Sequence, residues 1–209
     1  MVIQQKRSKQ TYQKVLNAAT QLFIKVGYHG ASISDIADAT GLTKGAIYFH
    51  FKSKEALVTA ILDDFERLYL DKMIAEVESN EGNALDKIKH YLRFTVNFFP
   101  RQLNLCFTHL ATELYARGKK PDQIEKIYKR YSDFITKILE IGKEEGVFRS
   151  DIDTAILAYN LIGALEGNLI QWKFNTRRWR GSSFARSFIK FYLYGIQTLG
   201  QGKEGTASK

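Results

Sequence analysis

The sequence predicts an all-α protein, and three observations support that class. The 209-residue chain contains only two prolines, Pro100 and Pro121, so long stretches carry no helix-breaking residue. Apolar residues recur with the helical period of 3.6 in one segment after another, and no segment alternates with period two for long enough to form a strand. An apolar fraction of 44% with 25% charged residues is typical of a globular protein rather than a disordered chain.

The first predicted helix runs from about residue 8 to residue 26. Gly27 is its expected stop, because glycine readily adopts the left-handed conformation that ends helices. One side of this helix carries an apolar stripe that consists of Val15, Leu16, Ala19, Leu22, Phe23 and Val26.

Two short helices joined by a tight turn follow. Ser32 and Asp35 have the spacing of a capping box, which opens a helix that Gly41 ends. Thr43 is placed to cap the second helix, from residue 44 to about residue 51. A short helix, a three-residue turn and a second short helix together predict a helix-turn-helix motif.

The rest of the chain is predicted to consist of long helices. Ser53 caps one that begins near Lys54, and five more follow, separated by breaks at residues 79–82, 100, 118–121, 146–151 and 176–182. We therefore expect about nine helices. The expected organisation is a three-helix domain in residues 1–54, a six-helix domain in residues 55–200 and a disordered tail in residues 201–209.

Positive charge is concentrated in the first quarter of the chain. The formal net charge is +9, and residues 1–54 carry eight basic and two acidic side chains, or +6 of that total. Such a segment indicates a polyanionic partner, either nucleic acid or an anionic membrane surface. A basic surface that is merely solvated explains the charge equally well.

Several classes of protein are disfavoured. The single cysteine, Cys106, excludes an intrachain disulfide framework and a cysteine-rich zinc site. The basic start lacks the apolar stretch of a signal peptide, and no run approaches the ~18 apolar residues of a membrane span. We therefore expect a cytoplasmic protein with no membrane association and no cofactor.

The helix-turn-helix sequence separates folding residues from outward-facing ones. Ala37 is small where the second helix crosses the first, and Ile36, Leu42, Ile47 and Phe51 are expected to form a small core with the preceding helix. The second helix then keeps an outer side that folding alone explains poorly, consisting of Lys44, Gly45, Tyr48, Phe49 and His50. A DNA groove lined with phosphates explains that composition well.

At this point the chain resembles a known family. The string GLTKGAIYFHFKSKEAL follows ASISDIADAT and, before it, FIKVGYHG. Together they are similar to the DNA-binding domain of the TetR family of bacterial transcription regulators, over about residues 9–57. The resemblance implies a three-helix DNA-binding domain followed by a six-helix domain for ligand binding and dimerisation.

The resemblance also implies roles for individual residues. Base edges and nearby phosphates would be contacted by the start of the recognition helix, that is Thr43, Lys44, Gly45 and Ala46. Phosphates, sugars and thymine methyls would be contacted by Ser32, Tyr48, Phe49, His50 and Lys54. Ser34 stands where relatives often have a basic residue, which puts a base contact from that helix in doubt. Lys54→Ala is expected to weaken binding to all duplexes alike and to lower the salt slope by about 2.

The N-terminal residues Lys6, Arg7 and Lys9 have two interpretations. They either form an arm on the DNA backbone or in the minor groove, or they are a flexible basic start. For Tyr48, a partly buried position in the core is the alternative to a phosphate contact. For His50, the alternative is an intramolecular hydrogen bond.

The last two helices predict a homodimer. Residues 155–172 are apolar nearly all round, and the final helix carries two apolar stripes. A second copy covering these faces would give a four-helix seam with two-fold symmetry, which requires a palindromic operator. A buried central layer in a monomer is the alternative.

An effector site is expected among aromatic residues of the middle helices. Most of these aromatics belong to the core, but polar groups embedded among them need a partner, either internal or a ligand. The candidate ligand-binding residues are Phe94, Phe98, Phe107, His109, Glu113, Tyr131, Asn168 and Trp172, and the further embedded polar residues are Thr108, Asn160 and Glu166. His109 and Glu113 have the i, i+4 spacing of a metal pair, although surface pairing is far commoner and no metal is expected.

A basic cluster interleaved with aromatics follows in the sequence. It consists of Lys173, Arg177, Arg178, Arg180, Arg186 and Lys190, and it is either a solvated rim or a site for an acidic head group such as that of an acyl-CoA.

The predicted function is a transcriptional repressor that binds DNA as a dimer and is released by a small hydrophobic effector of unknown identity. An enzyme is disfavoured, because the chain has no nucleophile elbow and no phosphate-binding glycine loop. The remaining alternative keeps DNA binding but places it under a protein partner or gives the protein an architectural role.

Overall fold

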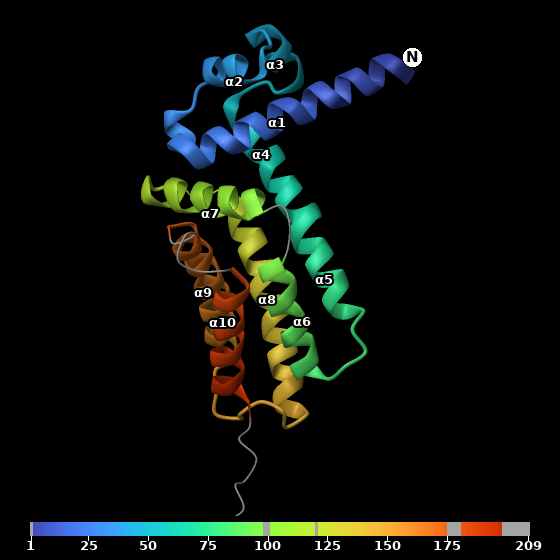
Figure 1. Ribbon diagram of the computed structural model, residues 1–209, viewed down its shortest axis with the longest axis vertical. Coiled ribbons are helices and arrows are strands. Elements are labelled where there is room, and N and C mark those ends of the chain that lie inside the picture. Colours follow the sequence, from blue (N-terminus) through green and yellow to red (C-terminus); the bar gives the residue numbers. More distant parts are fainter. Residues whose placement is uncertain (1, 98–100, 120, 175–180, 198–209) are drawn as a thin grey trace, which may run out of the picture. The chain divides into compact units, whose positions relative to one another are not determined.

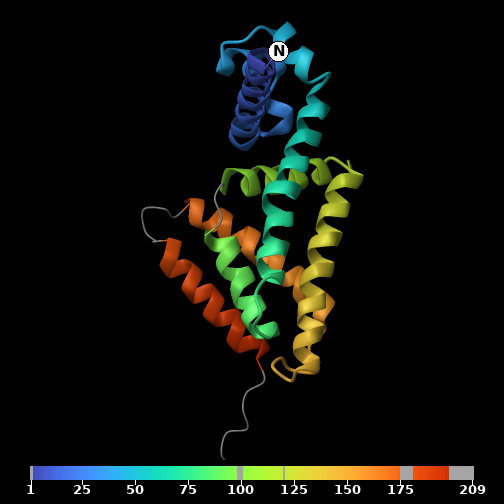
Figure 2. The ribbon, with the colours of Figure 1, turned by 90° about the vertical axis from the view of Figure 1, so that its right-hand side faces the viewer.

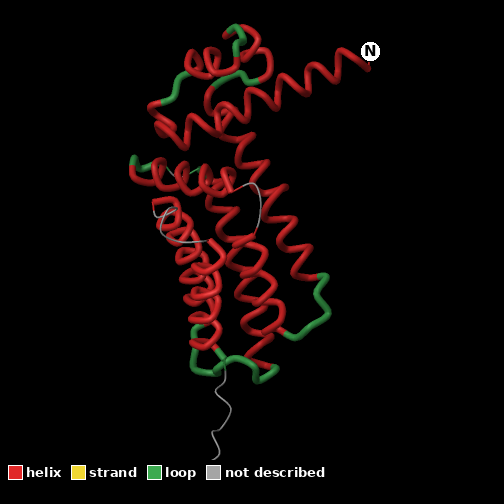
Figure 3. Tube along the Cα trace, viewed as in Figure 1, coloured by secondary structure: helices red, strands yellow, loops and turns green. Residues whose placement is uncertain are grey.

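The computed structural model describes residues 2–97, 101–119, 121–174 and 181–197. Within these ranges the chain consists of helices and short loops, apart from one isolated antiparallel bridge between Phe148 and Gln197 (Figure 3). The predicted all-α class is confirmed. Described helices form nine continuous stretches, as expected, because α4 (Lys54–Phe65), the π-helical turn η1 (Glu66–Leu70) and α5 (Asp71–Glu78) follow one another without a break. The expected disordered tail lies outside the described residues.

The chain folds as two compact units. The first contains the residues up to 72 together with the α7 region up to residue 129, and the second contains residues 73–97 and those from 130 onward. Helix α7 (Arg101–Ala116) joins the first unit because it packs against α1 (Val2–Gly30) and α4. The expected functional boundary after residue 54 does not coincide with these packing units and stays a prediction.

Helix α1 buries the apolar stripe that the sequence predicts. Val15, Leu16, Ala19 and Phe23 are buried, whereas Val26 at the end of the stripe is 48% exposed. The helix starts at Val2, about six residues before the expected start, because nothing in the basic segment interrupts the helix. Its regular geometry breaks at Gly27, and one more helical turn follows.

Aromatic stacking fixes the helices of the first unit to one another. The rings of Phe65 on α4 and Phe107 on α7 are stacked with centroids 3.9 Å apart. The ring of Tyr12 on α1 stacks on Phe51, which follows α3 (Lys44–His50), at 4.6 Å. These contacts join residues far apart in the sequence, so periodicity alone does not reveal them.

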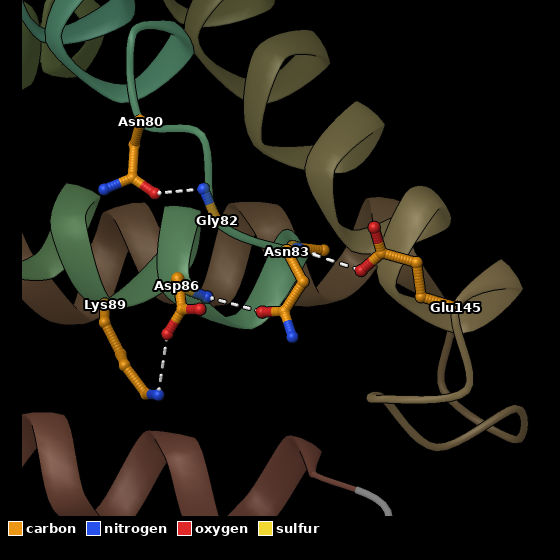
Figure 4. A network of polar contacts seen from close by, with 7 residues as sticks. Asn80, Gly82, Asn83, Asp86, Lys89 and Glu145 are labelled. Atoms are coloured by element: carbon orange, nitrogen blue, oxygen red, sulfur yellow. Dashed lines mark hydrogen bonds and ion pairs between the residues drawn. The ribbon is translucent and has the colours of Figure 1, made fainter.

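The second unit contains α6 (Ala84–Asn97), most of α8 (Asp122–Glu144), α9 (Thr154–Phe174) and α10 (Gly181–Ile196), with α10 packed against α6 (Figures 1 and 2). Two side chains cap the start of α6. Asn83 Oδ1 accepts the N–H of Asp86 at 3.1 Å, and Glu145 Oε2 accepts the N–H of Ala84 at 2.8 Å (Figure 4). These bonds satisfy two amides that a helix start otherwise leaves unpaired.

The turn between α8 and α9 is built around a close approach. A Cβ added to Gly142 would lie 2.0 Å from the Phe148 ring, which is buried, so no larger residue fits there without rearrangement. The following residue, Arg149, donates its backbone N–H to the carbonyl of Ile196 at 3.0 Å. This bond attaches the turn to the end of α10.

Candidate nucleic-acid interface

Local signals build the helix-turn-helix as the sequence predicts. Ser32 and Asp35 form a complete capping box at the start of α2 (Ile33–Thr40). Gly41 ends α2 in the left-handed conformation, with φ 64° and ψ 26°. Thr43 then caps α3, accepting the N–H of Ala46 at 3.2 Å. The resulting motif is visible in Figure 1.

The inner side of the motif is a small core. Ile36 and Ile47 are fully buried, and Ala37 and Phe51 are nearly so. Leu42, which the sequence placed in the same core, is only half-buried. Burial of the other four side chains fixes the orientation of α3 on α1 and α2.

The outer side of α3 presents large aromatic groups to solvent. Phe49 is 72% exposed and Tyr48 is 45% exposed, and Lys44 beside them is exposed as well. A core position for Tyr48 is therefore not observed. Exposed aromatics next to a cation are typical of a surface that contacts a partner.

Gly45 also lies on this side of α3. A Cβ at this position would meet only the Thr43 hydroxyl oxygen, at 3.9 Å, so the fold leaves room for a side chain. Glycine within a helix costs roughly 0.5–1 kcal/mol relative to alanine. Folding does not explain that cost, whereas close approach of the backbone to a partner does.

Three predicted contact residues are less exposed. Ala46 and Ser34 are half-buried. His50 is half-buried too, and its ring lies edge-on to Tyr12 and to Phe49, with centroid distances of 6.2 Å and 5.1 Å. The His50 ring is thus positioned by aromatic contacts at the end of α3.

Ser32 has a structural task in addition to its predicted phosphate contact. Its hydroxyl donates to Asp35 Oδ2 at 2.7 Å, and its backbone N–H donates to the same oxygen at 2.7 Å. These two hydrogen bonds hold the pKa of Asp35 below its usual value. Ser32 is exposed, but its hydroxyl proton is already used inside the capping box.

Lys54 is engaged within the domain, which the sequence did not suggest. Its Nζ donates to the carbonyl oxygens of Tyr28 at 2.7 Å and Ala31 at 2.8 Å, and it lies 4.2 Å from the centroid of the Tyr28 ring. Burial lowers the pKa of Lys54, against the raising effect of the neighbouring Glu55. The primary role of Lys54 in this geometry is to hold the end of α1.

Gly27 creates the site that Glu113 occupies on the end of α1. Its φ of 78° and ψ of 167° interrupt the helix, and the next two backbone N–H groups lose their helical acceptors. Glu113 on α7 accepts both of them, from Tyr28 at 2.6 Å and from His29 at 3.0 Å. A Cβ on Gly27 would approach Glu113 Oε2 to 2.8 Å, so this position requires glycine on two counts.

Hydrogen bonds shift the ionisation of this cluster. Burial acts to raise the pKa of Glu113, but the two backbone donors and the charge of His29 together lower it. Burial, followed by the hydrogen bond that its hydroxyl donates to Glu55 at 2.8 Å, raises the pKa of Tyr28 to about 12. Glu113 is therefore a carboxylate at neutral pH, with both oxygens bonded to the backbone of α1.

The candidate ligand-binding residues divide between the two units. On α7 in the first unit, Phe107 is buried and His109 is half-buried. Glu113 accepts a backbone hydrogen bond from α1, so its partner is internal, one of the two possibilities that the sequence allowed. In the same unit Thr108 donates to the carbonyl of Asn104 at 3.1 Å. Glu113 and Thr108 thus have partners without a ligand, whereas the side-chain oxygen of Asn104 on the same helix is buried with no hydrogen-bond partner among the described residues.

In the second unit, Phe94 and Asn168 are half-buried. The hydroxyl groups of Tyr131 and Tyr91 lie 3.0 Å apart in the core. Asn160 is exposed, so its interpretation as an embedded polar group was wrong. Phe98, the Trp172 side chain and most of the basic cluster lie outside the described residues, and Arg186 and Lys190 of that cluster are exposed.

The described residues offer neither a metal site nor a membrane span. They contain no group of three or more His, Cys, Asp or Glu side chains arranged to hold a metal ion. No described helix combines the length and the apolar character needed to cross a bilayer.

Sequence reasoning missed Tyr12, Tyr28 and Glu55 as residues that position the interface. Tyr12 appears in the sequence as an ordinary helix residue, and its stacking on Phe51 joins positions 39 residues apart. The capping role of Glu113 spans 85 residues to Tyr28. A local pattern carries no signal for such contacts; the break at Gly27 was the only hint that amides there need an acceptor.

Comparison with known proteins agrees with this geometry. Residues 15–61 match the family model described as "Bacterial regulatory proteins, tetR family", and residues 65–194 match "YsiA-like protein, C-terminal region". The fatty acid metabolism regulator protein of Bacillus subtilis is 22% identical over 93% of this chain and 98% of its own length. The A-factor receptor protein of Streptomyces griseus is 30% identical over 78% of this chain, which spans 55% of that longer relative.

A solved structure shares the fold over nearly the whole chain. The MbdR regulator from Azoarcus sp. CIB superimposes with a TM-score of 0.80 at 26% identity, covering 90% of this chain and 100% of that one. The two family models together cover most of the sequence, and further relatives from Escherichia coli and Rhodococcus jostii are named as an HTH-type transcriptional regulator and an HTH-type transcriptional repressor. The chain therefore belongs to the TetR family of bacterial regulatory proteins and is a DNA-binding transcriptional regulator.

Proposed function

We propose that this protein is a repressor that binds a palindromic operator as a homodimer and leaves it when a small hydrophobic effector binds. The observation that carries the proposal is the outer side of α3, where Phe49 is 72% exposed beside Tyr48 and Lys44. Folding does not use these side chains. In the major groove the aromatic groups would contact sugars, thymine methyls and phosphates, and Lys44 would contact base edges or phosphates.

Exposed apolar residues on the last two helices support the dimer. Ile156 and Tyr159 on α9 are 60% and 59% exposed, and Phe191 and Tyr194 on α10 are 78% and 63% exposed. Exposed side chains of this size on adjacent helices are unusual for a monomer. If a second copy covers them through two-fold symmetry, the two α3 helices contact the two halves of a palindrome.

The name of one relative and the largely aromatic set of candidate ligand-binding residues indicate the class of effector. One relative is named a fatty acid metabolism regulator. Fatty acids and their coenzyme A thioesters are therefore the first compounds to test. The proposed effector contacts are, in the first unit, Phe98, Phe107 and His109 and, in the second unit, Phe94, Tyr131, Asn168 and Trp172; we propose Glu113 mainly as the cap of α1.

The experiment that tests the proposal is selection of duplexes from a random library by the purified protein at modest ionic strength, without any small molecule. We expect enrichment of one sequence with two-fold symmetry. Enrichment of an asymmetric half-site only, or of none, would contradict the dimeric repressor. Adding fatty acids and acyl thioesters then tests release, and an effector at 100 times its Kd is expected to add about 2.7 kcal/mol to the free energy of unfolding.

A further inference from the structure

Residues 5–10 of α1 form a helical stretch that no other described part of the domain covers. Six consecutive side chains, at residues 5–10, are exposed. A helix normally owes its stability to a buried apolar face, and this stretch buries none. Its first turn also lacks an acidic residue, the type that favours a helix N-terminus. Folding therefore gives no reason for this extension.

The side of α1 turned away from the core has one kind of chemistry. The exposed residues of this side are basic or carry amide groups, namely Lys6, Arg7, Lys9, Gln10, Gln13, Lys14 and Asn17. Asp35 is the first acidic residue in the chain, so none of these cations has an acidic neighbour on its own helix. Lysine, arginine and amide side chains are the groups that proteins use to bind DNA phosphates.

The extension begins where the recognition helix ends. Tyr12 lies between the two elements, since its ring stacks on Phe51 at 4.6 Å and meets His50 edge-on at 6.2 Å. At a rise of 1.5 Å per residue, Lys9 and Lys6 lie about 4.5 Å and about 9 Å further along α1. Figure 1 shows this part of α1 extending past α2 and α3 within the N-terminal unit.

We infer that residues 2–14 form a second DNA contact, in which the extended α1 lies against the sugar-phosphate backbone flanking the base pairs that α3 covers. This inference rests on the proposed function of α3. The ten residues before Tyr12 rise about 15 Å, which corresponds to about four phosphates of one strand. The contact supplies affinity without sequence information, because it is made to the backbone.

The test is the salt dependence of binding to the selected operator, measured for the wild type and for the triple variant Lys6→Gln/Arg7→Gln/Lys9→Gln. Glutamine keeps a similar helix propensity, so circular dichroism should show an unchanged fold. Each lost phosphate contact lowers the slope of log K against log salt by about 0.9, so three contacts in each half of a dimer lower it by about 5. A matched control, Lys72→Gln/Lys126→Gln/Lys137→Gln, removes the same charge from exposed positions elsewhere and should change the slope by less than about 1.

A second measurement uses the length of the duplex. On an operator trimmed to the bases beneath the two α3 helices, wild type and triple variant should bind alike; four or more flanking base pairs on each side should strengthen only the wild type. An unchanged slope in the triple variant overturns the inference and leaves the function of α3 standing. The inference is also overturned if the triple variant binds the operator as the wild type does but loses a binding to anionic lipid vesicles that the wild type shows. Failure of the wild type to bind any duplex instead overturns the proposed function itself.

Discussion

Two surfaces of this molecule expose aromatic side chains to a similar degree but differ in their surroundings. On α3, Tyr48 and Phe49 stand beside Lys44 in a segment that carries most of the net charge. On α9 and α10, Tyr159 and Phe191 belong to a larger group of exposed apolar and aromatic side chains. Arg186 and Lys190 are also exposed on α10, and Lys190 Nζ lies 5.7 Å from the centroid of the Tyr194 ring. Exposed aromatics predict a partner on both surfaces, and the side chains around them indicate its kind. Beside Lys44 in the basic N-terminal segment they indicate a polyanion, and among four large exposed apolar or aromatic side chains on α9 and α10 they indicate a second copy of the chain.

Charge placed on the apolar surface of α9 and α10 should weaken operator binding most. Tyr159→Glu combined with Phe191→Glu should convert the dimer to monomer, because four carboxylates would be buried in the two-fold interface without partners. Operator affinity should then fall by at least about a thousandfold, the gap that commonly separates specific from non-specific binding. Sedimentation and operator titration measure the two effects.

The matched control for this variant is Ile141→Glu, at a position on α8 that is 37% exposed. It should leave the dimer and operator binding intact. A double variant that remains dimeric would show that these helices face solvent or another partner, and it would contradict their role in binding a second copy of the chain.

The next effect concerns the α3 surface. Tyr48→Phe removes one hydroxyl from a residue that is 45% exposed, so the free energy of unfolding should change by less than about 0.5 kcal/mol. Operator affinity should fall by about tenfold or more per half-site, since a hydrogen bond to a charged phosphate contributes about 1.5–3 kcal/mol. Fluorescence anisotropy titration of the operator measures this affinity, and the mass of the dimer in solution is the control that oligomerisation is unchanged. An unchanged affinity would show that the Tyr48 hydroxyl does not contact DNA.

Glu113 caps the end of α1, and its contribution to the free energy of unfolding should depend on pH. Glu113→Gln leaves one of the amides of Tyr28 and His29 without a good acceptor, which should destabilise the fold by about 1–3 kcal/mol at pH 7. The folded-state pKa of Glu113 lies below its ordinary value of 4.5, so its contribution is fully present above that value and is lost as the pH falls through the folded pKa.

Denaturant unfolding of wild type and Glu113→Gln across the acidic range tests this prediction. Their stability difference should be constant from neutral pH down to about pH 5 and should shrink at lower pH. Comparing the two proteins cancels the contributions of other carboxylates, such as Asp35, whose pKa is also lowered. A difference that does not vary with pH would mean that the charge of Glu113 plays no part.

The smallest effects come from two glycines that the monomer does not need. At Gly45 on α3 and Gly163 on α9, a Cβ would meet no atom closer than 3.9 Å. Alanine at either position should stabilise the monomer by roughly 0.5–1 kcal/mol. Gly45→Ala should weaken DNA binding without affecting the dimer, and Gly163→Ala should weaken the dimer. If both variants gain stability and keep full binding, neither backbone lies close to a partner.

The sequence predicted most of the fold and the outer side of α3 because those features depend on local patterns. Caps at Ser32 and Thr43 and the left-handed Gly41 act over three or four residues, and apolar periodicity identifies each helix. The early start of α1 was missed because an exposed, polar helix has no apolar period to detect.

The long-range polar contacts could not be predicted. Glu113 and Lys54 have sequence surroundings that suit a ligand site and a phosphate contact, and only the three-dimensional fold brings them to the end of α1. A polar residue in an apolar stretch of sequence is expected to need a hydrogen-bond partner, but the sequence does not identify that partner. The same limit applies to the effector site, whose candidates are distributed over both units.

Photo-crosslinking can identify the partner of each surface: p-benzoylphenylalanine replaces Phe49 in one sample and Phe191 in another, and each variant is mixed with the selected operator. We predict that the probe at Phe49 labels DNA within the half-site and that the probe at Phe191 labels a second copy of the protein. If the probe at Phe49 labels protein or nothing while the duplex is bound, α3 does not lie in the groove and the account is contradicted.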